Sequence, residues 1–275
     1  IRAAAKNFKD VLVVSTMEQY PALENLLREK EGNTAIEDRK KFAAESFDIS
    51  SHYDTAIFNY MAADQEIERF KVSERESQTL RYGENPHQQG HFYGPLNELF
   101  EQLNGKALSY NNLVDVDAAV SLIEEFSTDE TAFAVLKHTN ACGVAIGSNV
   151  KDAYLKAFAA DTISAFGGVL ISNQPIDLAA AEELHKLFFE VLIAPEFDAD
   201  ALELLSAKKN RILLVKKQSL NSKKQFKNLL NGVIVQDRDL ISDAAADFKL
   251  ATKKATTGEE DKALVFASKI AKHTK

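Results

Sequence analysis

Short apolar runs alternate with helix-like stretches over most of the chain after Gln78. The runs have the length of strands, and we expect strands at 79–82, 133–136, 168–172, 191–193, 212–215 and 233–236. Apolar residues spaced three and four positions apart predict helices at 115–126, 150–159, 177–188, 198–208 and 257–273. Strands that alternate with helices are typical of a layered α/β domain, and we predict a mixed sheet here.

Polar residues at the expected helix starts support these boundaries. Asp177 and Asp198 have the position and chemistry of N-caps, and Thr257 with Glu260 has the pattern of a capping box. Asp115 also suits an N-cap, at the start of the first of these helices, which would give it a structural role.

The first 61 residues follow a different pattern. We expect a short buried strand at 11–14, a helix at about 17–30, a second helix that begins with a Thr34–Glu37 capping box, and a third helix that carries Tyr53, Ile57, Tyr60 and Met61 on one face. One strand with several helices cannot close a sheet, so we predict that this unit is incomplete or docks on something else. Residues 62–77 are charged and lack aliphatic periodicity, which predicts a linker.

Composition narrows the class of protein. The chain has 275 residues, 45% hydrophobic and 27% charged, with a net charge of −8, which argues against a general nucleic-acid binder. Its one cysteine, Cys142, excludes an intramolecular disulfide and favours a cytoplasmic location. No apolar run has transmembrane length and no signal peptide is recognisable. The start without Met and the helical pattern at the end, which lacks a stop signal, predict a piece of a longer protein.

The first candidate site is the end of the strand expected at 133–136. Adjacent Lys137 and His138 follow this apolar run, and a polar turn with Thr139 and Asn140 comes next. Neighbours on a continuing strand point to opposite faces, so the pair serves one site only if the strand ends at about Leu136. The alternative is a solvated lysine beside a hydrogen-bonded histidine.

Three further stretches have residues suited to ligand binding. Arg81 and Tyr82 open a turn that can present an arginine fork to a phosphate or carboxylate, or that is simply a hydrogen-bonded surface turn. Phe166 and Gly167 combine a ring for stacking with close backbone approach, although a glycine-rich entry into the next strand explains them as well. Glu190 lies just before an expected buried strand, where it is either a ligand or a structural carboxylate.

Metal chemistry is disfavoured. A zinc deaminase needs two closely spaced cysteines in addition to a His or Cys ligand, and one cysteine cannot supply them. The six histidines show no helical ligand pair. Cys142 lies four residues after His138, and nothing in the sequence marks it as an activated nucleophile.

Taken together, the stretches Arg-Tyr-Gly-Glu-Asn-Pro-His-Gln, Lys-His-Thr-Asn-Ala-Cys-Gly and Ser-Ala-Phe-Gly-Gly resemble the bifunctional purine-biosynthesis family that joins AICAR transformylase to IMP cyclohydrolase. The resemblance covers essentially the whole chain. It implies that residues 1–61 are the tail of a methylglyoxal-synthase-like cyclohydrolase domain. It also implies that residues 78–275 are the first half of a transformylase domain with a cytidine-deaminase-like fold that lacks zinc.

The resemblance also implies an activity and its residues. The family transfers a formyl group from 10-formyltetrahydrofolate to the 5-amino group of AICAR and then closes the product to IMP, without a metal. His138 corresponds to the general base, Lys137 to the cation that stabilises the transition state, and Lys6 to the cyclohydrolase lysine. The positions that correspond to AICAR ligands are Arg81, Tyr82, Phe166, Gly167 and Glu190. A homodimer is also implied, and a non-catalytic nucleotide-binding or assembly module remains the alternative.

Overall fold

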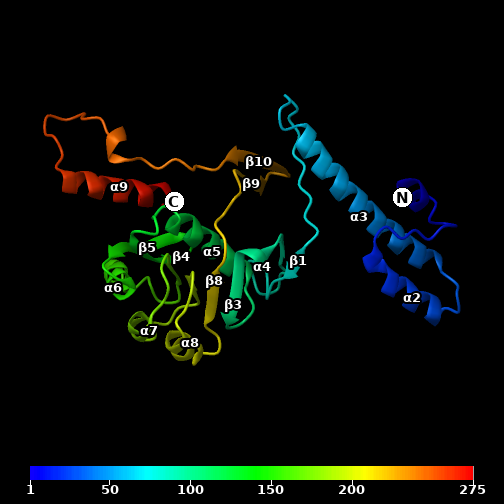
Figure 1. Cartoon of the computed structure of the whole chain (residues 1–275), viewed down its shortest axis with the longest axis horizontal. Helices are drawn as coiled ribbons and strands as arrows, with labels where there is room; N and C mark the ends of the chain where they lie inside the picture. The colour runs from blue at the N-terminus through cyan, green and yellow to red at the C-terminus, as the bar shows by residue number, and fades with distance from the viewer. Residues whose placement is uncertain (275) are drawn as a thin grey trace. The chain divides into compact units, whose positions relative to one another are not determined.

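A computed structural model describes residues 1–274. The chain divides into two compact units, with the boundary between Ser77 and Gln78. Figure 1 shows the elements of both, and each unit is described by itself below. Among the described residues, no helix is both long and apolar enough to cross a membrane.

Unit 1 is helical. It contains α1 (Arg2–Lys6), a 3₁₀ turn η1 (Met17–Gln19), α2 (Tyr20–Glu29) and α3 (Ile36–Met61). Its core is small: Ala5, Val13 and Ala43 are buried, and the rings of Phe8 and Phe47 pack against them. The guanidinium of Arg39 ties the unit together by donating to the carbonyl oxygens of Phe8, Lys9 and Thr34 at 3.0, 2.7 and 2.7 Å.

Three expectations for this unit are wrong. Residues 11–14 are all apolar but form no strand, and Val13 is the one among them that is buried. The second helix is capped one residue later than expected, because the Asp38 carboxylate accepts the Ala35 N–H at 2.7 Å. The two helices expected between 34 and 61 are one continuous helix of 26 residues, since no glycine or proline interrupts it.

Unit 2 is built on a six-stranded mixed sheet in the order β3-β8-β7-β6-β4-β5. Strands β6, β7 and β8 are parallel, while β4 runs antiparallel to both β6 and β5, and β3 runs antiparallel to β8. The strands span Phe100–Asn104 (β3), Thr131–Lys137 (β4), Asn140–Gly147 (β5), Val169–Ser172 (β6), Val191–Ala194 (β7) and Ile212–Lys216 (β8). The predicted mixed sheet within an α/β fold is therefore confirmed.

Helices cover both faces of the sheet (Figure 1). Alternate strand residues such as Phe133 and Leu170 pack against α6 (Val150–Ala160), α7 (Leu178–Leu184) and α8 (Ala199–Ser206). The residues between them, such as Ala134 and Ile171, pack against α5 (Tyr110–Ile123) and α4 (Leu96–Leu99). Because both faces are covered, the inner strands β4, β6, β7 and β8 are almost entirely apolar and show no alternation in sequence.

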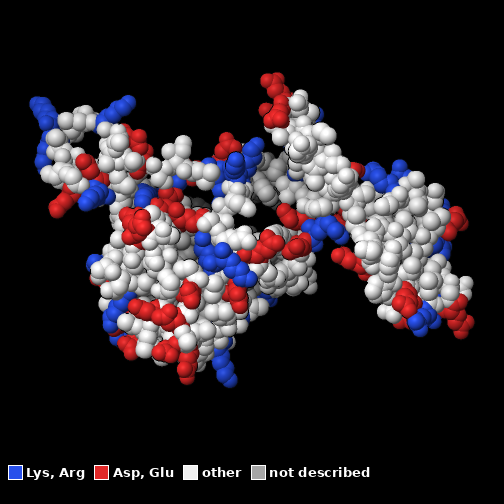
Figure 2. Space-filling model, viewed as in Figure 1, with Lys and Arg blue, Asp and Glu red and all other residues white. Residues whose placement is uncertain are grey.

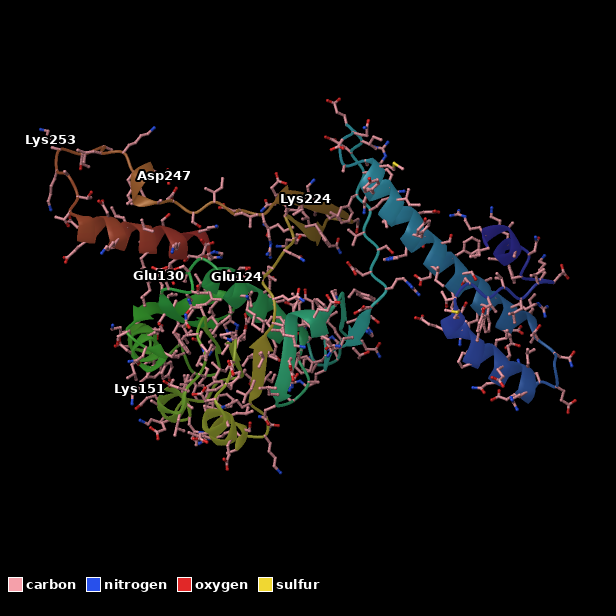
Figure 3. The ribbon with its side chains drawn as sticks, in the orientation of Figure 1. Glu124, Glu130, Lys151, Lys224, Asp247 and Lys253 are labelled. Carbon is pink, nitrogen blue, oxygen red and sulfur yellow. The ribbon has the colours of Figure 1, made fainter. Side chains whose placement is uncertain are left out.

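The remaining elements lie outside this sheet. Strands β1 (Ser77–Thr79) and β2 (His91–Tyr93) pair with each other, as do the antiparallel β9 (Lys224–Leu229) and β10 (Gly232–Asp237). A 3₁₀ turn η2 (Ala245–Asp247) leads to α9 (Gly258–Lys272). The ring of Phe266 in α9 packs 5.8 Å from that of Phe126, and Lys269 pairs with Glu130, which is labelled in Figure 3.

The surface over α6 and α7 carries both signs of charge. Figure 2 shows blue and red side chains interspersed on this face. Lys151 and Lys186 both pair with Glu183, at 3.1 and 2.5 Å, and Lys156 pairs with Asp152 at 2.8 Å. Such exposed pairs add little to stability, because water and salt screen their charges.

The helix boundaries of unit 2 agree with the sequence in part. Thr257 and Glu260 form the predicted capping box of α9, and the Asp177 carboxylate caps α7 by accepting the Ala180 N–H at 2.7 Å. Asp115 is not an N-cap: α5 begins earlier, with Ser109 as its cap, and Asp115 lies inside the helix. The first expected strand is also misplaced, because β1 ends at Thr79, before Arg81 and Tyr82.

Candidate functional site

The Lys-His pair lies at a hairpin turn. Strand β4 continues through Lys137, which pairs with Asn140 of β5, so the expected strand end at Leu136 is one residue too early. The turn between them consists of His138 and Thr139, with φ angles of 51° and 64°. Positive φ at both central residues is the mark of a type I′ turn. The turn interrupts strand alternation at His138, and neither Lys137 nor His138 is sealed in the core.

Lys137 reaches the glycine-rich loop. Its Nζ donates to the carbonyl oxygen of Phe166 at 2.8 Å. This bond joins two stretches that the sequence separates by 29 residues. Strands β4 and β6 are neighbours with Leu136 opposite Val169, so the end of β4 meets the loop that leads into β6.

Two glycines let this loop approach the strand. A Cβ on Gly168 would lie 2.6 Å from the Leu136 carbonyl oxygen, closer than real contacts allow. Gly167 has φ of +74°, and its N–H donates to the Phe188 carbonyl at 2.8 Å. The ring of Phe166 is 59% exposed and lies 5.0 Å from that of Phe188, so one side of it remains available for stacking on a planar ligand.

Glu190 directly precedes β7, at the same end of the strands as Lys137. Its N–H donates to the Gly168 carbonyl at 3.0 Å, and its carboxylate pairs with Lys106 at 2.8 Å. A pocket of about 300 Å³ lies beside this pair, lined by Lys106, Phe188, Phe189, Glu190, Lys208, Lys209, Asn210 and Arg211. Sequence reasoning missed Lys106 and Phe188, because only contacts between distant segments identify them.

Arg81 and Tyr82 are held by main-chain bonds. The Arg81 N–H donates to the Leu108 carbonyl at 2.9 Å, and the Tyr82 carbonyl accepts the Tyr110 N–H at 3.1 Å. The guanidinium of Arg81 lies 4.7 Å from the Tyr82 ring and donates to its hydroxyl at 2.9 Å. No carboxylate of residues 1–274 lies within ion-pair distance of Arg81, so its charge is available for an anion.

Helix α5 connects Arg81 and Tyr82 to the hairpin turn. Tyr110, which binds Tyr82, is its first residue, and the Asp115 carboxylate accepts the Thr139 N–H at 2.8 Å. Five helical residues span about 7.5 Å, so both segments are anchored on the first two turns of one helix. Burial raises the pKa of the Asp115 carboxyl, and the hydrogen bond from the Thr139 N–H together with the proximity of His138 opposes that rise.

The other candidates lie elsewhere or carry no activating feature. Lys6 is the exposed last residue of α1, in unit 1. Burial and the nearby Asp161 raise the pKa of the Cys142 thiol, which disfavours the reactive thiolate. Within residues 1–274, no group of three or more His, Cys, Asp or Glu side chains is arranged to hold a metal ion.

Comparison with known proteins identifies the family. Residues 4–275 match the family described as AICARFT/IMPCHase bienzyme. The chain belongs to this family. The resemblance predicted from the motifs is thereby confirmed.

Several relatives of the AICARFT/IMPCHase family align along the whole chain. Each is called bifunctional purine biosynthesis protein PurH. The proteins of Bacteroides thetaiotaomicron, Rippkaea orientalis and Clostridium perfringens are 53%, 45% and 43% identical to it over 275, 287 and 283 residues. The alignments include all of this chain but 54%, 56% and 55% of these proteins. The chain therefore spans about half the length of the curated relatives it matches.

Proposed function

We propose that this chain acts in purine biosynthesis and supplies residues for transfer of a formyl group from 10-formyltetrahydrofolate to the 5-amino group of AICAR. Family membership supports the proposal, because the relatives are named bifunctional purine biosynthesis proteins. The structural observation that carries it is the bond from Lys137 Nζ to the Phe166 carbonyl, at 2.8 Å, which joins two of the three motifs at one sheet edge.

In the proposed mechanism, His138 is the general base. The amine of an aminoimidazole carboxamide is a poor nucleophile, because its lone pair is delocalised into the ring and the carboxamide. Attack on the formyl carbon therefore needs a base that removes the amine proton as the new C–N bond forms. The bond from the formyl carbon to N10 of the folate then breaks, and N10 takes up a proton as tetrahydrofolate leaves. The exposed position of His138 in the turn leaves its imidazole accessible to a substrate.

Lys137 would stabilise the charge that develops on the formyl oxygen. An ammonium fixed at that point favours the transition state over the ground state, where the oxygen carries little charge. Its bond to the Phe166 carbonyl orients the amine while leaving two further N–H donors for the reaction.

The remaining residues would bind AICAR. Arg81, which has no carboxylate partner within residues 1–274, provides a guanidinium for the phosphate, with the Tyr82 hydroxyl hydrogen-bonded beside it. Phe166 offers a stacking surface, Gly167 close backbone approach, and Glu190 a carboxylate for the polar groups of the ring.

We assign the second family activity, closure to IMP, to a site that includes Lys6 in a methylglyoxal-synthase-like domain. We also propose residues 1–61 and 78–275 as parts of the two catalytic domains, joined by a linker at 62–77. We further propose a homodimer located in the cytoplasm.

The test compares this chain with a relative of full length. Both proteins are given AICAR and 10-formyltetrahydrofolate, and formyl transfer and AICAR binding are measured separately. Turnover by both supports a catalytic role for residues 78–274. Binding without turnover by the shorter chain favours the alternative of a nucleotide-binding module. This alternative is worth testing because the chain spans only about half the length of its relatives. Absence of AICAR binding in both would refute the proposed substrate.

A further inference from the structure

The turn that carries His138 is unfavourable for its own sequence. His138 and Thr139 both have positive φ, a conformation that histidine adopts more readily than most residues but that asparagine, aspartate and glycine favour in such turns. Thr139 is β-branched, and such a residue rarely adopts this conformation. A conformation of this kind persists only where surrounding contacts hold it in place.

Asp115 provides such a contact from outside the hairpin. Its Oδ1 accepts the Thr139 N–H at 2.8 Å, and the neighbouring His138 N–H also acts to lower the pKa of this carboxyl. Helix α5, which carries Asp115, is held in place because Val116, Ala119 and Val120 of this helix are buried against the sheet. The turn is therefore tied to the core by one half-buried side chain.

A second hairpin in the protein serves as a comparison. The turn between β9 and β10 consists of Leu230 and Asn231, with φ angles of 49° and 61°. Leu230 of this turn is highly exposed. No side chain in the described part of the chain accepts a hydrogen bond from the Leu230 or Asn231 N–H. Asn231 tolerates this conformation, and Leu230 adopts it without such a bond. The hydrogen bond from Thr139 to Asp115 is therefore a feature that distinguishes the His-Thr turn from this one.

We propose that Asp115 is a positioning residue for formyl transfer, which fixes His138 by holding the N–H of Thr139, the other residue of the turn. This inference rests on the proposed function, in which His138 is the base. Displacement of a catalytic group by about 1 Å costs on the order of 10²-fold in rate. An unrestrained turn would displace His138 while leaving the residues that bind AICAR in place.

The experiment uses a full-length protein and three variants. Asp115→Ala removes the acceptor, Asp115→Asn retains an acceptor oxygen without the charge, and Asp117→Asn is the control, an exposed carboxylate on the same helix. We expect Asp115→Ala to lower kcat by about 10²-fold with little change in KM for AICAR. We expect Asp115→Asn to recover most of kcat, and Asp117→Asn to behave as the wild type.

Hydrogen exchange provides a readout that does not depend on activity. The Thr139 amide should exchange slowly in the wild type and in Asp115→Asn, and quickly in Asp115→Ala. Unchanged exchange at Thr139 in a folded Asp115→Ala protein would overturn the proposal, as would fast exchange with an unchanged kcat. A normal rate in His138→Ala would instead refute the assignment of the base, and the exchange result would still decide whether Asp115 holds the turn.

Discussion

Lys137 and Phe166 are joined by a hydrogen bond of 2.8 Å, from the ammonium of one to the main-chain carbonyl of the other. Because the acceptor is a backbone atom, the bond depends on the path of the glycine-rich loop and not on the Phe166 ring. The close approach of Gly168 to Leu136 fixes that path. The position of the ammonium is thus set by the same loop that we propose as a wall of the substrate site.

This relationship predicts a catalytic effect for Lys137→Ala. In a full-length protein, loss of the ammonium should lower kcat for formyl transfer by about 10²–10³-fold, since a fixed donor at the developing charge is removed. Steady-state kinetics would measure the change. Lys156→Ala is the control, because Lys156 is exposed in an ion pair on α6. A near-normal kcat in a folded Lys137→Ala protein would remove Lys137 from the mechanism.

His138→Ala should have a different kinetic signature. We expect a loss of roughly 10²–10⁴-fold in rate, the usual contribution of a general base, while AICAR binding weakens much less. Binding is measured by calorimetry and the rate by assay on the same sample. His91→Ala, which alters an exposed histidine of β2, is the control. Equal losses in binding and in rate would indicate that His138 binds substrate and is not the base.

The inner strands β4, β6, β7 and β8 were predictable because both sheet faces are buried, whereas β2, β3 and β9 were not predicted. Buried residues such as Leu136 and Ile171 each lie in a continuous apolar run, and such runs are easily recognised in the sequence. Strand β5 was not predicted, since its residues Asn140 to Gly147 include polar residues and glycines that are typical of a loop. Pairing with β4 imposes the strand, and a single sequence does not reveal such pairing.

The candidate site residues differ in the same way: those in distinctive local stretches are recognisable from the sequence, and those defined by distant contacts are not. Lys137, His138, Arg81 and Gly167 belong to unusual local stretches and could be selected from the sequence. Asp115 was interpreted as an N-cap, because an aspartate before an apolar helical pattern usually has that role. Its bond to Thr139 links residues 24 positions apart, so no local pattern contains it.

Glu190→Gln should separate substrate binding from stability. The Lys106–Glu190 pair is more than a quarter exposed on each side, so its loss should cost less than about 1 kcal/mol of unfolding free energy. If Glu190 contacts AICAR, loss of the charge should raise KM for AICAR by about tenfold or more. Lys106→Met removes the same ion pair and is the matched control. Equal KM values in the two variants would mean that Glu190 acts only through Lys106.

Gly143→Ala should destabilise unit 2. A Cβ at Gly143 in β5 would lie 1.9 Å from the carbonyl oxygen of Ala157, a backbone atom of α6 that cannot move aside alone. We expect a loss of about 1–3 kcal/mol or more in unfolding free energy. Gly258→Ala is the control, because that position has open space around it at the start of α9 and alanine favours a helix. Urea unfolding of both variants measures the difference, and equal midpoints would show that α6 can shift at no cost.

Glu125 should make the attachment of α9 sensitive to acid. Burial works to raise the pKa of its carboxyl, but hydrogen bonds from Lys272, Ser242 and His273 outweigh burial and hold the pKa below the ordinary value of 4.5. The Lys272 and His273 nitrogens lie 2.7 and 2.9 Å from the carboxylate. As the pH falls, the unfolded chain therefore binds a proton at this site before the folded chain does.

The sign of the pH effect follows from this order. The stability that Glu125 contributes is complete above pH 4.5 and is lost as the pH falls through the lower, folded-state pKa. Urea unfolding of the wild type and of Glu125→Gln, over a pH range on both sides of 4.5, isolates this contribution from that of other carboxylates. The wild type should be the more stable protein at neutral pH, and the difference should shrink as the solution becomes acidic. A difference that stays constant with pH would mean that the Glu125 contacts do not depend on its charge.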